Sequence, residues 1–170
     1  AGLDLNATGT VVTVNGDAKT YAELPFAPWY DNGSSVTYVY SNVILSTETG
    51  KHYLLVSVSG PSSPIAVSSP STVTGSYTVQ FRVTFDQTGV GNDFTGNLVS
   101  VDGTNFTING LSVSYWWDKD SYHSFAFFSP LIVNSSIQYS WSSTTGLASL
   151  QNGTLAATTS GSVTGNYLIG

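Results

Sequence analysis

The chain repeats itself at an offset of 87 residues, the distance from Gly9 to Gly96. The segment GTVVTVNGDAKTYAEL at 9–24 aligns with GNLVSVDGTNFTINGL at 96–111, and VTGSY at 73–77 meets VTGNY at 163–167 after a slip of three residues. Self-similarity at a fixed offset indicates that one structural unit is used twice. We therefore expect two tandem domains from an internal duplication, residues 1–80 and residues 81–170.

Apolar and polar residues alternate through most of both copies, and β-branched and aromatic types are frequent. Such alternation predicts β-strands. The turn pairs Asn15-Gly16 and Asp102-Gly103 favour tight hairpins. The fold class is therefore expected to be all-β, with two tandem immunoglobulin-like or pilin-like β-sandwich domains. The predicted strands of the first copy are TVVTVNG at 10–16, SVTYVYSNVIL at 35–45, HYLLVSVSG at 52–60 and SYTVQFRVTFD at 76–86.

Composition excludes several functional classes. Charged residues make up 8% of the chain, against about 25% in an average soluble protein. With a net charge of -6 and no basic stripe, the chain is not expected to bind nucleic acid. The absence of cysteine rules out disulfides and Cys-ligated metals. No apolar run reaches the roughly 18 residues of a membrane helix. Ala1 suits a signal-peptide cleavage site, so we expect a secreted protein, and the uncharged polar composition favours an acidic habitat.

The two ends of the chain are shorter than its middle. Between the copies, Tyr77 to Gly96 includes a complete strand, whereas only Ala1–Thr8 precedes Gly9. A sandwich that lacks a strand exposes an apolar groove and unpaired edges. We expect the N-terminal segment to act as a donor strand for a neighbouring subunit. The alternative is that the segment pairs within its own sheet or frays. The predicted donor residues are Gly2, Leu3, Asp4, Leu5, Asn6, Ala7 and Thr8.

The run WWDKDSYHSFAFFSPLIVNSSIQYSWSSTTGLASLQNGTLAATTSGSVTGNY at 116–167 resembles a repeat of archaeal surface proteins. Together with the duplication and the short ends, it makes the chain similar to the thread-type pilins of thermoacidophilic archaea. That family implies a glycosylated head-to-tail homopolymer on the cell surface, serving adhesion or biofilm formation, in which each N-terminal strand completes the next subunit. The similar repeat also occurs in surface-layer proteins and near secreted acid proteases.

Five sequons for N-linked glycosylation occur in the chain, and a secreted setting favours their modification. N-linked glycans are the only non-protein groups that we expect, with no cofactor. Asn32, Asn134 and Asn152 are predicted to lie in turns, and Asn6 is predicted to face away from Leu3 and Leu5 on the donor strand. The five sequon asparagines are Asn6, Asn32, Asn105, Asn134 and Asn152.

No catalytic or metal-binding set can be assembled from the sequence, so we expect no enzymatic activity. Asp31 and Asp118 occupy equivalent places in the two copies, but neither is followed by the Thr/Ser-Gly of an aspartic protease, and turn roles are favoured. His52 and His123 are not equivalent and lack a Gly-x-Ser-x-Gly partner.

The aromatic residues leave an alternative function open. Trp29 and Trp116 are equivalent in the two copies and are predicted to anchor the cores. Trp117 and its counterpart Tyr30 are predicted to be surface aromatics. A cell-surface adhesin or glycan-binding module that uses the ring of Trp117 is therefore the alternative to a filament subunit.

Overall fold

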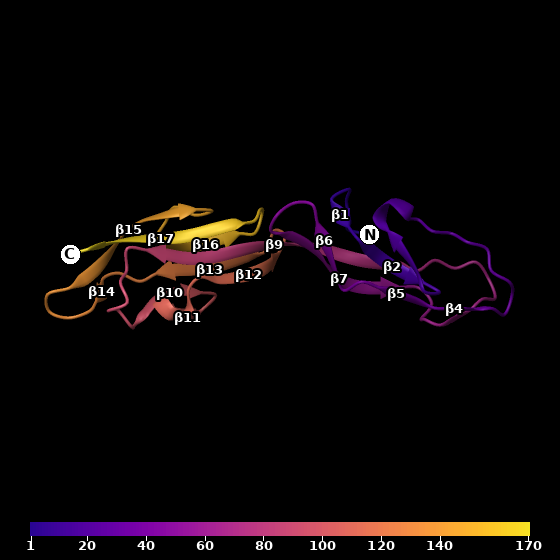
Figure 1. Cartoon of the computed structure of the whole chain (residues 1–170), viewed down its shortest axis with the longest axis horizontal. Helices are drawn as coiled ribbons and strands as arrows, with labels where there is room; N and C mark the ends of the chain where they lie inside the picture. Colours follow the sequence, from indigo (N-terminus) through magenta and orange to yellow (C-terminus); the bar gives the residue numbers. More distant parts are fainter. The chain divides into compact units, whose positions relative to one another are not determined.

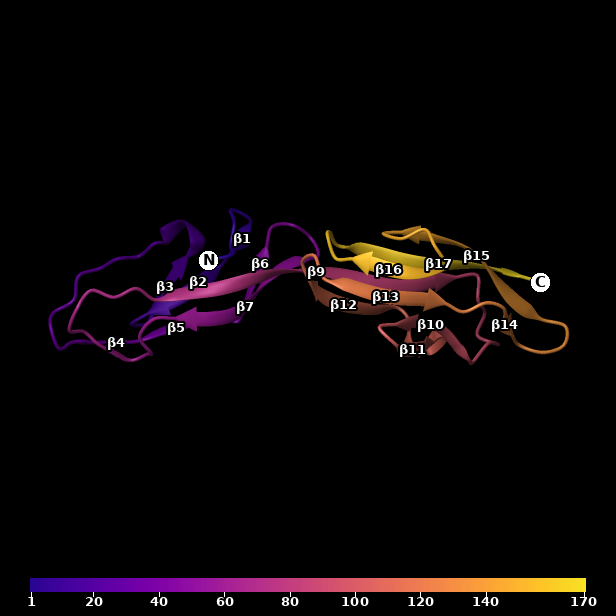
Figure 2. The ribbon, with the colours of Figure 1, turned by 180° about the vertical axis from the view of Figure 1, so that it is seen from behind.

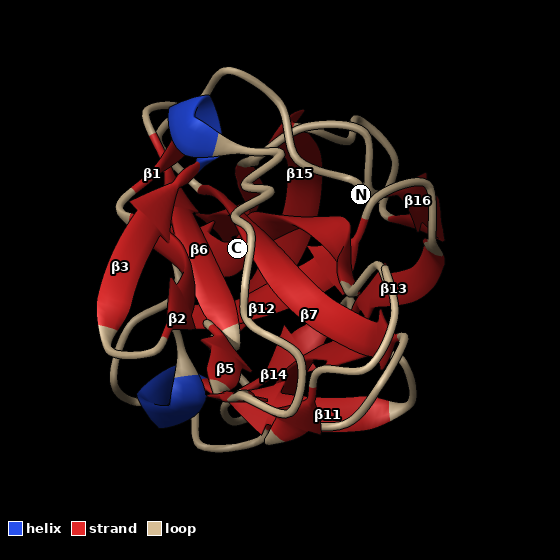
Figure 3. Cartoon of the chain, turned by 90° about the vertical axis from the view of Figure 1, so that its right-hand side faces the viewer, coloured by secondary structure: helices blue, strands red, loops and turns tan.

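The computed structural model describes all 170 residues. They divide into two units, Ala1–Gln80 (unit 1) and Phe81–Gly170 (unit 2), each with its own internal contacts. Figure 3 shows strands joined by loops. The helical structure consists of two 3-10 helices of three residues each. No helix is long or apolar enough to cross a membrane. The expected all-β class is confirmed, and the several sheets are consistent with a β-sandwich.

Unit 1 contains three groups of paired strands, in the orders β3-β2-β5, β4-β8 and β1-β6-β7-β9. The 3-10 helix η1 follows β3 (Figure 1). The elements of unit 1 are β1 (Ala7–Thr8), β2 (Thr10–Val14), β3 (Asp17–Thr20), η1 (Tyr21–Glu23), β4 (Ser35–Val36), β5 (Tyr38–Tyr40), β6 (Val43–Ser46), β7 (Lys51–Ser59), β8 (Ile65–Ala66) and the first half of β9 (Thr74–Thr88).

Unit 2 contains two groups of paired strands. One has the order β11-β10-β13-β16, and in the other the second half of β9 pairs with both β12 and β17, followed by β15 and β14 (Figure 2). The further elements of unit 2 are β10 (Asn97–Val101), β11 (Thr104–Thr107), η2 (Ile108–Gly110), β12 (Val113–Asp118), β13 (Tyr122–Phe127), β14 (Leu131–Ile132), β15 (Gln138–Gly146), β16 (Asn152–Ala156) and β17 (Gly161–Ile169).

The alternation in the sequence determines which side chains reach the cores. In β9, Val83 and Phe85 are fully buried, whereas Thr84 between them faces away from the core. The buried cluster of unit 2 contains fifteen residues, including these two. The buried cluster of unit 1 contains only four, although the units differ little in length. The residues of the small cluster are Val11, Ile44, Tyr53 and Tyr77.

The predicted hairpin turns are present in both units. Asn15 and Gly16 connect β2 to β3 with φ angles of 49° and 80°, and Asp102 and Gly103 connect β10 to β11 with 48° and 80°. Positive φ at both central positions is the requirement of a type I′ hairpin turn, which Asn-Gly and Asp-Gly satisfy.

The predicted strand at 35–45 is broken into three short strands, β4, β5 and β6. Its backbone pairs with different partners along its length. The Thr37 amide donates to the side-chain oxygen of Asn15, and the Ser41 amide donates to the Val11 carbonyl oxygen. The prediction of a single uninterrupted strand for this segment was therefore wrong.

Candidate functional site: an open strand position in unit 1

Matching contacts relate positions of unit 1 to positions of unit 2. The buried hydroxyl of Tyr77 donates to the Ser41 carbonyl oxygen at 2.7 Å. In unit 2 the hydroxyl of Tyr167 donates to the Phe128 carbonyl oxygen at 2.9 Å. These two tyrosines therefore mark corresponding places in the two units.

Two glycines that precede these tyrosines extend the correspondence. A Cβ on Gly75 would lie 2.5 Å from the ring of Tyr40, and a Cβ on Gly165 would lie 2.5 Å from the ring of Phe127. Only glycine lets the strand backbone approach an aromatic ring this closely. The segment around Gly75 in unit 1 thus corresponds to the segment of β17 around Gly165.

The start of the chain corresponds to the end of β9. Gly2 and Gly89 have φ angles of +84° and +92°. A Cβ on Gly2 would collide with the Tyr77 carbonyl oxygen, and a Cβ on Gly89 would collide with the Tyr167 carbonyl oxygen. Ala1-Gly2 of unit 1 therefore takes the place that Thr88-Gly89 takes in unit 2.

In unit 2, a complete strand precedes this glycine. The second half of β9 pairs in parallel with β17, from Val83 opposite Gly161 to Thr88 opposite Asn166, and pairs on its other side with β12 (Figure 2). The Phe85 ring lies 5.9 Å from that of Trp117, centroid to centroid. Strand Phe81–Thr88 therefore supplies both backbone pairing and core side chains to unit 2.

In unit 1, the same position holds one residue. The amino group of Ala1 donates to the Gly75 carbonyl oxygen at 2.6 Å, and the Tyr77 amide donates to the Ala1 carbonyl oxygen at 3.0 Å. These bonds reproduce the last rung of the parallel ladder of unit 2. The segments that would flank a full strand, 71–73 and 26–31, form no strand, although their counterparts belong to β17 and β12. We call this edge of residues 71–77 the open position.

The open position exposes apolar side chains whose counterparts in unit 2 are covered. Tyr30 is 37% exposed, whereas its counterpart Trp117 is 5% exposed. Val73 is half-buried and its counterpart Val163 is fully buried. The difference follows from the absence in unit 1 of a strand that carries residues like Val83 and Phe85.

The predicted donor residues fold against their own unit in this structure of one chain. Leu3 and Ala7 pack against the buried cluster of unit 1, and Ala7 and Thr8 form β1, opposite Ser46 and Leu45 of β6. Leu5 is 90% exposed. The predicted placement of Leu3 and Leu5 on one face of a continuous strand is therefore not realised in the single chain.

Asp4 causes the interruption and attaches the segment to unit 1. Its backbone and side-chain oxygens accept hydrogen bonds from the amides of Ala7 and Asn6, which forms a local turn. The Asp4 carboxylate also accepts a short hydrogen bond from the Tyr53 hydroxyl and pairs with the Lys51 ammonium at 3.1 Å. The Tyr53 hydrogen bond, with help from the Asn6 amide and Lys51, lowers the pKa of Asp4 although burial opposes the shift.

Four of the five sequon asparagines are exposed. Asn32 lies in a turn and Asn134 in a bend, as predicted, but Asn152 is the first residue of β16 and not part of a turn. Asn105 lies on β11. Asn6 is half-buried, and its side-chain nitrogen donates to Glu48 at 2.7 Å.

The predicted roles of the tryptophans were wrong. Trp29 and Trp116 are exposed and do not anchor the cores, whereas Trp117 is buried. The Trp117 ring stacks on the His123 ring with 3.7 Å between centroids and 3° between planes. A buried, stacked ring offers no free face to a sugar, so Trp117 is unsuited to glycan binding. Sequence reasoning missed this because Phe85, on a different strand, also covers the ring.

Sequence reasoning also missed a line of three polar side chains in unit 2. The Ser121 hydroxyl lies 2.8 Å from Nε2 of His123, and Nδ1 of His123 lies 2.7 Å from the Asp102 carboxylate. This order resembles a hydrolase triad. However, the Ser121 hydroxyl also donates to the Asp118 carbonyl oxygen at 2.6 Å.

The same serine contact occurs in unit 1 without a histidine. The Ser34 hydroxyl donates to the Asp31 carbonyl oxygen at 2.7 Å, and Val36 stands where unit 2 has His123. The serine hydroxyl therefore closes the Asp-to-Ser turn in both units. We interpret His123 as a structural residue whose two ring nitrogens connect this turn to the Asp102 hairpin.

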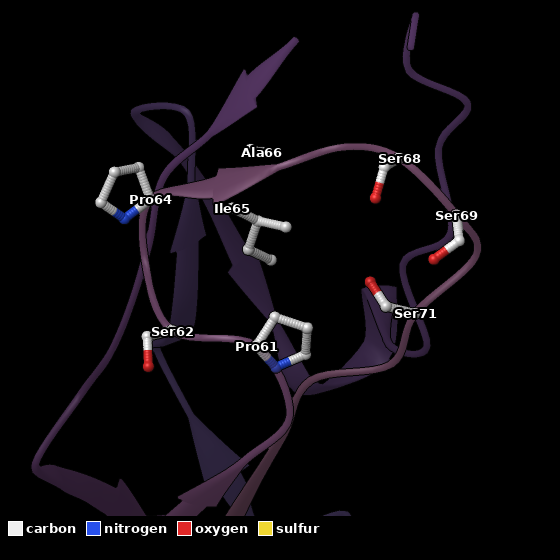
Figure 4. A pocket seen from close by; sticks show the side chains of 8 residues that line it. All are labelled: Pro61, Ser62, Pro64, Ile65, Ala66, Ser68, Ser69 and Ser71. Carbon is white, nitrogen blue, oxygen red and sulfur yellow. The ribbon is translucent and has the colours of Figure 1, made fainter. Parts of the chain in front are cut away.

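A pocket of about 270 Å³ lies in the loop between β7 and β9 (Figure 4). Its lining consists of prolines, serines, Ile65 and Ala66, without a titratable side chain. Ser71, at the start of the open position, belongs to this lining. No group of three or more His, Cys, Asp or Glu residues is arranged to hold a metal ion.

Comparisons of the chain with family models, with curated proteins and with solved structures found no match.

Proposed function

We propose that the chain is a structural subunit of an extracellular, glycosylated filament. Identical subunits join head to tail when the N-terminal strand Gly2–Thr8 of one subunit completes the fold of the next. The two units are pilin-like β-sandwich domains that arose by duplication, as in thread-type pilins, and the filament serves adhesion to cells or surfaces. The observation that carries the proposal is the open position of unit 1.

Leu5 gives the proposal its most direct support. A leucine that is 90% exposed contributes little to the stability of the single chain. Burial of one such side chain contributes about 1.5–3 kcal/mol. The same molecule thus exposes an apolar side chain and an unpaired strand edge. Polymerisation by strand addition buries the leucine and pairs the edge.

The test compares Leu5→Ser with Leu150→Ser. Leu150 is 65% exposed and lies in unit 2, so neither substitution should change the thermal unfolding of the monomer. Electron microscopy and sedimentation of the purified chain should show filaments for the parent and for Leu150→Ser, but monomers for Leu5→Ser. Filaments of normal length from Leu5→Ser, or from a chain without residues 1–8, would refute strand donation.

A second candidate function is glycan binding by an adhesin, which the 98% exposure of Trp29 favours. An exposed aromatic ring offers an apolar face on which a sugar ring can stack. Glycan-array binding by the monomer that disappears in Trp29→Ala would support this function. Unchanged binding in Trp29→Ala would exclude this site.

A further inference from the structure

We propose that unit 1 is the acceptor and that Ala1–Thr8 of a second copy enters the open position parallel to residues 71–76. In this register Leu3 and Leu5 take the places that Val83 and Phe85 hold in unit 2. The inference rests on the proposed function and specifies the interface between subunits. It states which unit accepts the donor strand, in which direction that strand runs and which of its side chains face inward.

Unit 2 is excluded as the acceptor because its own chain fills the corresponding position. Val83 and Phe85 of β9 are fully buried there, and six consecutive residues of β9 pair with β17. A second strand would have to displace this pairing and both core side chains. Unit 1 has only Ala1 at the same place, so far less must be displaced.

The direction follows from the correspondence between the units. The strand of unit 2 runs parallel to β17, and the two hydrogen bonds of Ala1 with Gly75 and Tyr77 have the pattern of a parallel bridge opposite Ser76. A strand that continues this ladder therefore runs in the direction of β9. An antiparallel donor would not reproduce this bridge.

The N-terminal segment of a second copy fits this position in length and pattern. Both Ala1–Thr8 and Phe81–Thr88 have eight residues, and both end in Thr followed by a glycine with positive φ, Gly9 or Gly89. Superposed without gaps, Leu3 falls on Val83 and Leu5 falls on Phe85.

The neighbouring residues in unit 1 agree with this register. Phe85 packs against Trp117 and Phe125, and the corresponding residues of unit 1 are Tyr30 and Tyr38. Tyr30 is 37% exposed, so its ring gains cover when Leu5 enters. Val73 then lies opposite Leu5, as Val163 lies opposite Phe85.

Acceptance requires that the acceptor release its own first residues. Ala1 occupies the last rung of the ladder, and Asp4 holds the segment through Tyr53 and Lys51. In a chain of subunits, each released segment is donated onward, so every subunit loses one set of contacts and gains another. Leu5 is the residue whose burial changes most in this exchange.

Engineered cysteines test the register, because the chain has no native cysteine. Directly opposed residues of neighbouring strands lie close enough for a disulfide. The pair Leu5→Cys with Val73→Cys, oxidised under assembly conditions, should give a ladder of covalent multimers on non-reducing gels. The pair Leu5→Cys with Thr72→Cys is the register control, because strand alternation turns Thr72 to the opposite face once residues 71–76 pair with the donor strand. This pair should give at least tenfold less ladder.

A third pair, Leu5→Cys with Val163→Cys, tests the acceptor unit. A ladder from this pair, without one from Val73→Cys, overturns unit 1 as acceptor while filament formation stands. A cross-link within one chain in the Val73→Cys pair overturns donation to a second copy. Cysteine at position 5 weakens the apolar contact. Binding is therefore also measured between a synthetic peptide of residues 1–8 and a chain that lacks these residues.

In isothermal titration calorimetry the peptide should bind this truncated chain, and a peptide with serine at both leucine positions should bind at least tenfold more weakly. Equal binding of the two peptides, or no binding, overturns the register. Absence of filaments from the parent chain, by contrast, overturns the proposed function itself.

Discussion

Val73 and Val163 occupy corresponding places, so the same substitution at both reports whether the open position is open in the monomer. Val163 is fully buried within the cluster of unit 2. Val163→Ala removes two methyl groups, at about 0.8 kcal/mol each, and leaves a cavity, so we expect a loss of about 2 kcal/mol. Val73 is half-buried, and Val73→Ala should cost less than about 1 kcal/mol.

Urea denaturation followed by circular dichroism measures both losses. With an m-value of about 2 kcal/mol/M, Val163→Ala should lower the midpoint by about 1 M and Val73→Ala by less than about 0.5 M. When the peptide of residues 1–8 saturates the truncated chain, the cost of Val73→Ala should approach that of Val163→Ala. Equal losses at the two sites in the monomer would refute the reasoning, because they would show that unit 1 already covers Val73.

Three other predictions follow from individual contacts. Burial raises the pKa of Tyr77 to about 12. The contribution of the neutral Tyr77 hydroxyl to folding stability is therefore complete below the ordinary tyrosine pKa of about 10, and it is lost as the pH rises from there through 12. Tyr77→Phe should remove part of this alkaline loss in pH-dependent unfolding. The lowered pKa of Asp4 gives folding stability the opposite pH dependence. The contribution of the Asp4 carboxylate to stability is present above the unfolded pKa of about 4 and is lost as the pH falls through the folded value. Proteolysis of residues 1–8 should therefore accelerate in acid, and Asp4→Asn should be cut rapidly at all pH values. Mass spectrometry of glycopeptides from the native protein should find lower occupancy at half-buried Asn6 than at exposed Asn32; equal occupancy would contradict this.

Local chemistry made parts of the fold predictable from the sequence. Asn15-Gly16 and Asp102-Gly103 form the expected hairpins because their requirement for positive φ is met within two residues. The alternation around Val83 and Phe85 likewise predicted a strand with one buried face. These features depend on neighbours in the sequence, so the sequence pattern contains them.

The environments of Leu5 and Trp117 could not be predicted in the same way. Leu5 is exposed because Asp4 forms a turn and binds Tyr53, a contact between segments far apart in the chain. Trp117 is buried because Phe85 and His123 cover its ring. In each case the partner lies on another strand. The alternation of apolar and polar residues predicts which side chains share a face of a strand, but it does not predict what covers that face.

Hydrogen exchange at the open position tests the central claim most directly. The Tyr77 amide bonds to Ala1 at this edge, and strand alternation turns the Gly75 amide the same way. The Val73 amide takes the same direction once a donor strand pairs with it, as its counterpart Val163 pairs in unit 2. These two amides should exchange rapidly in the monomer and at least a hundredfold more slowly in the assembled filament. Val163 and Gly165, the corresponding residues of unit 2, should be protected in both states. Equally rapid exchange of Val73 and Gly75 in the filament would contradict donation of a strand to unit 1.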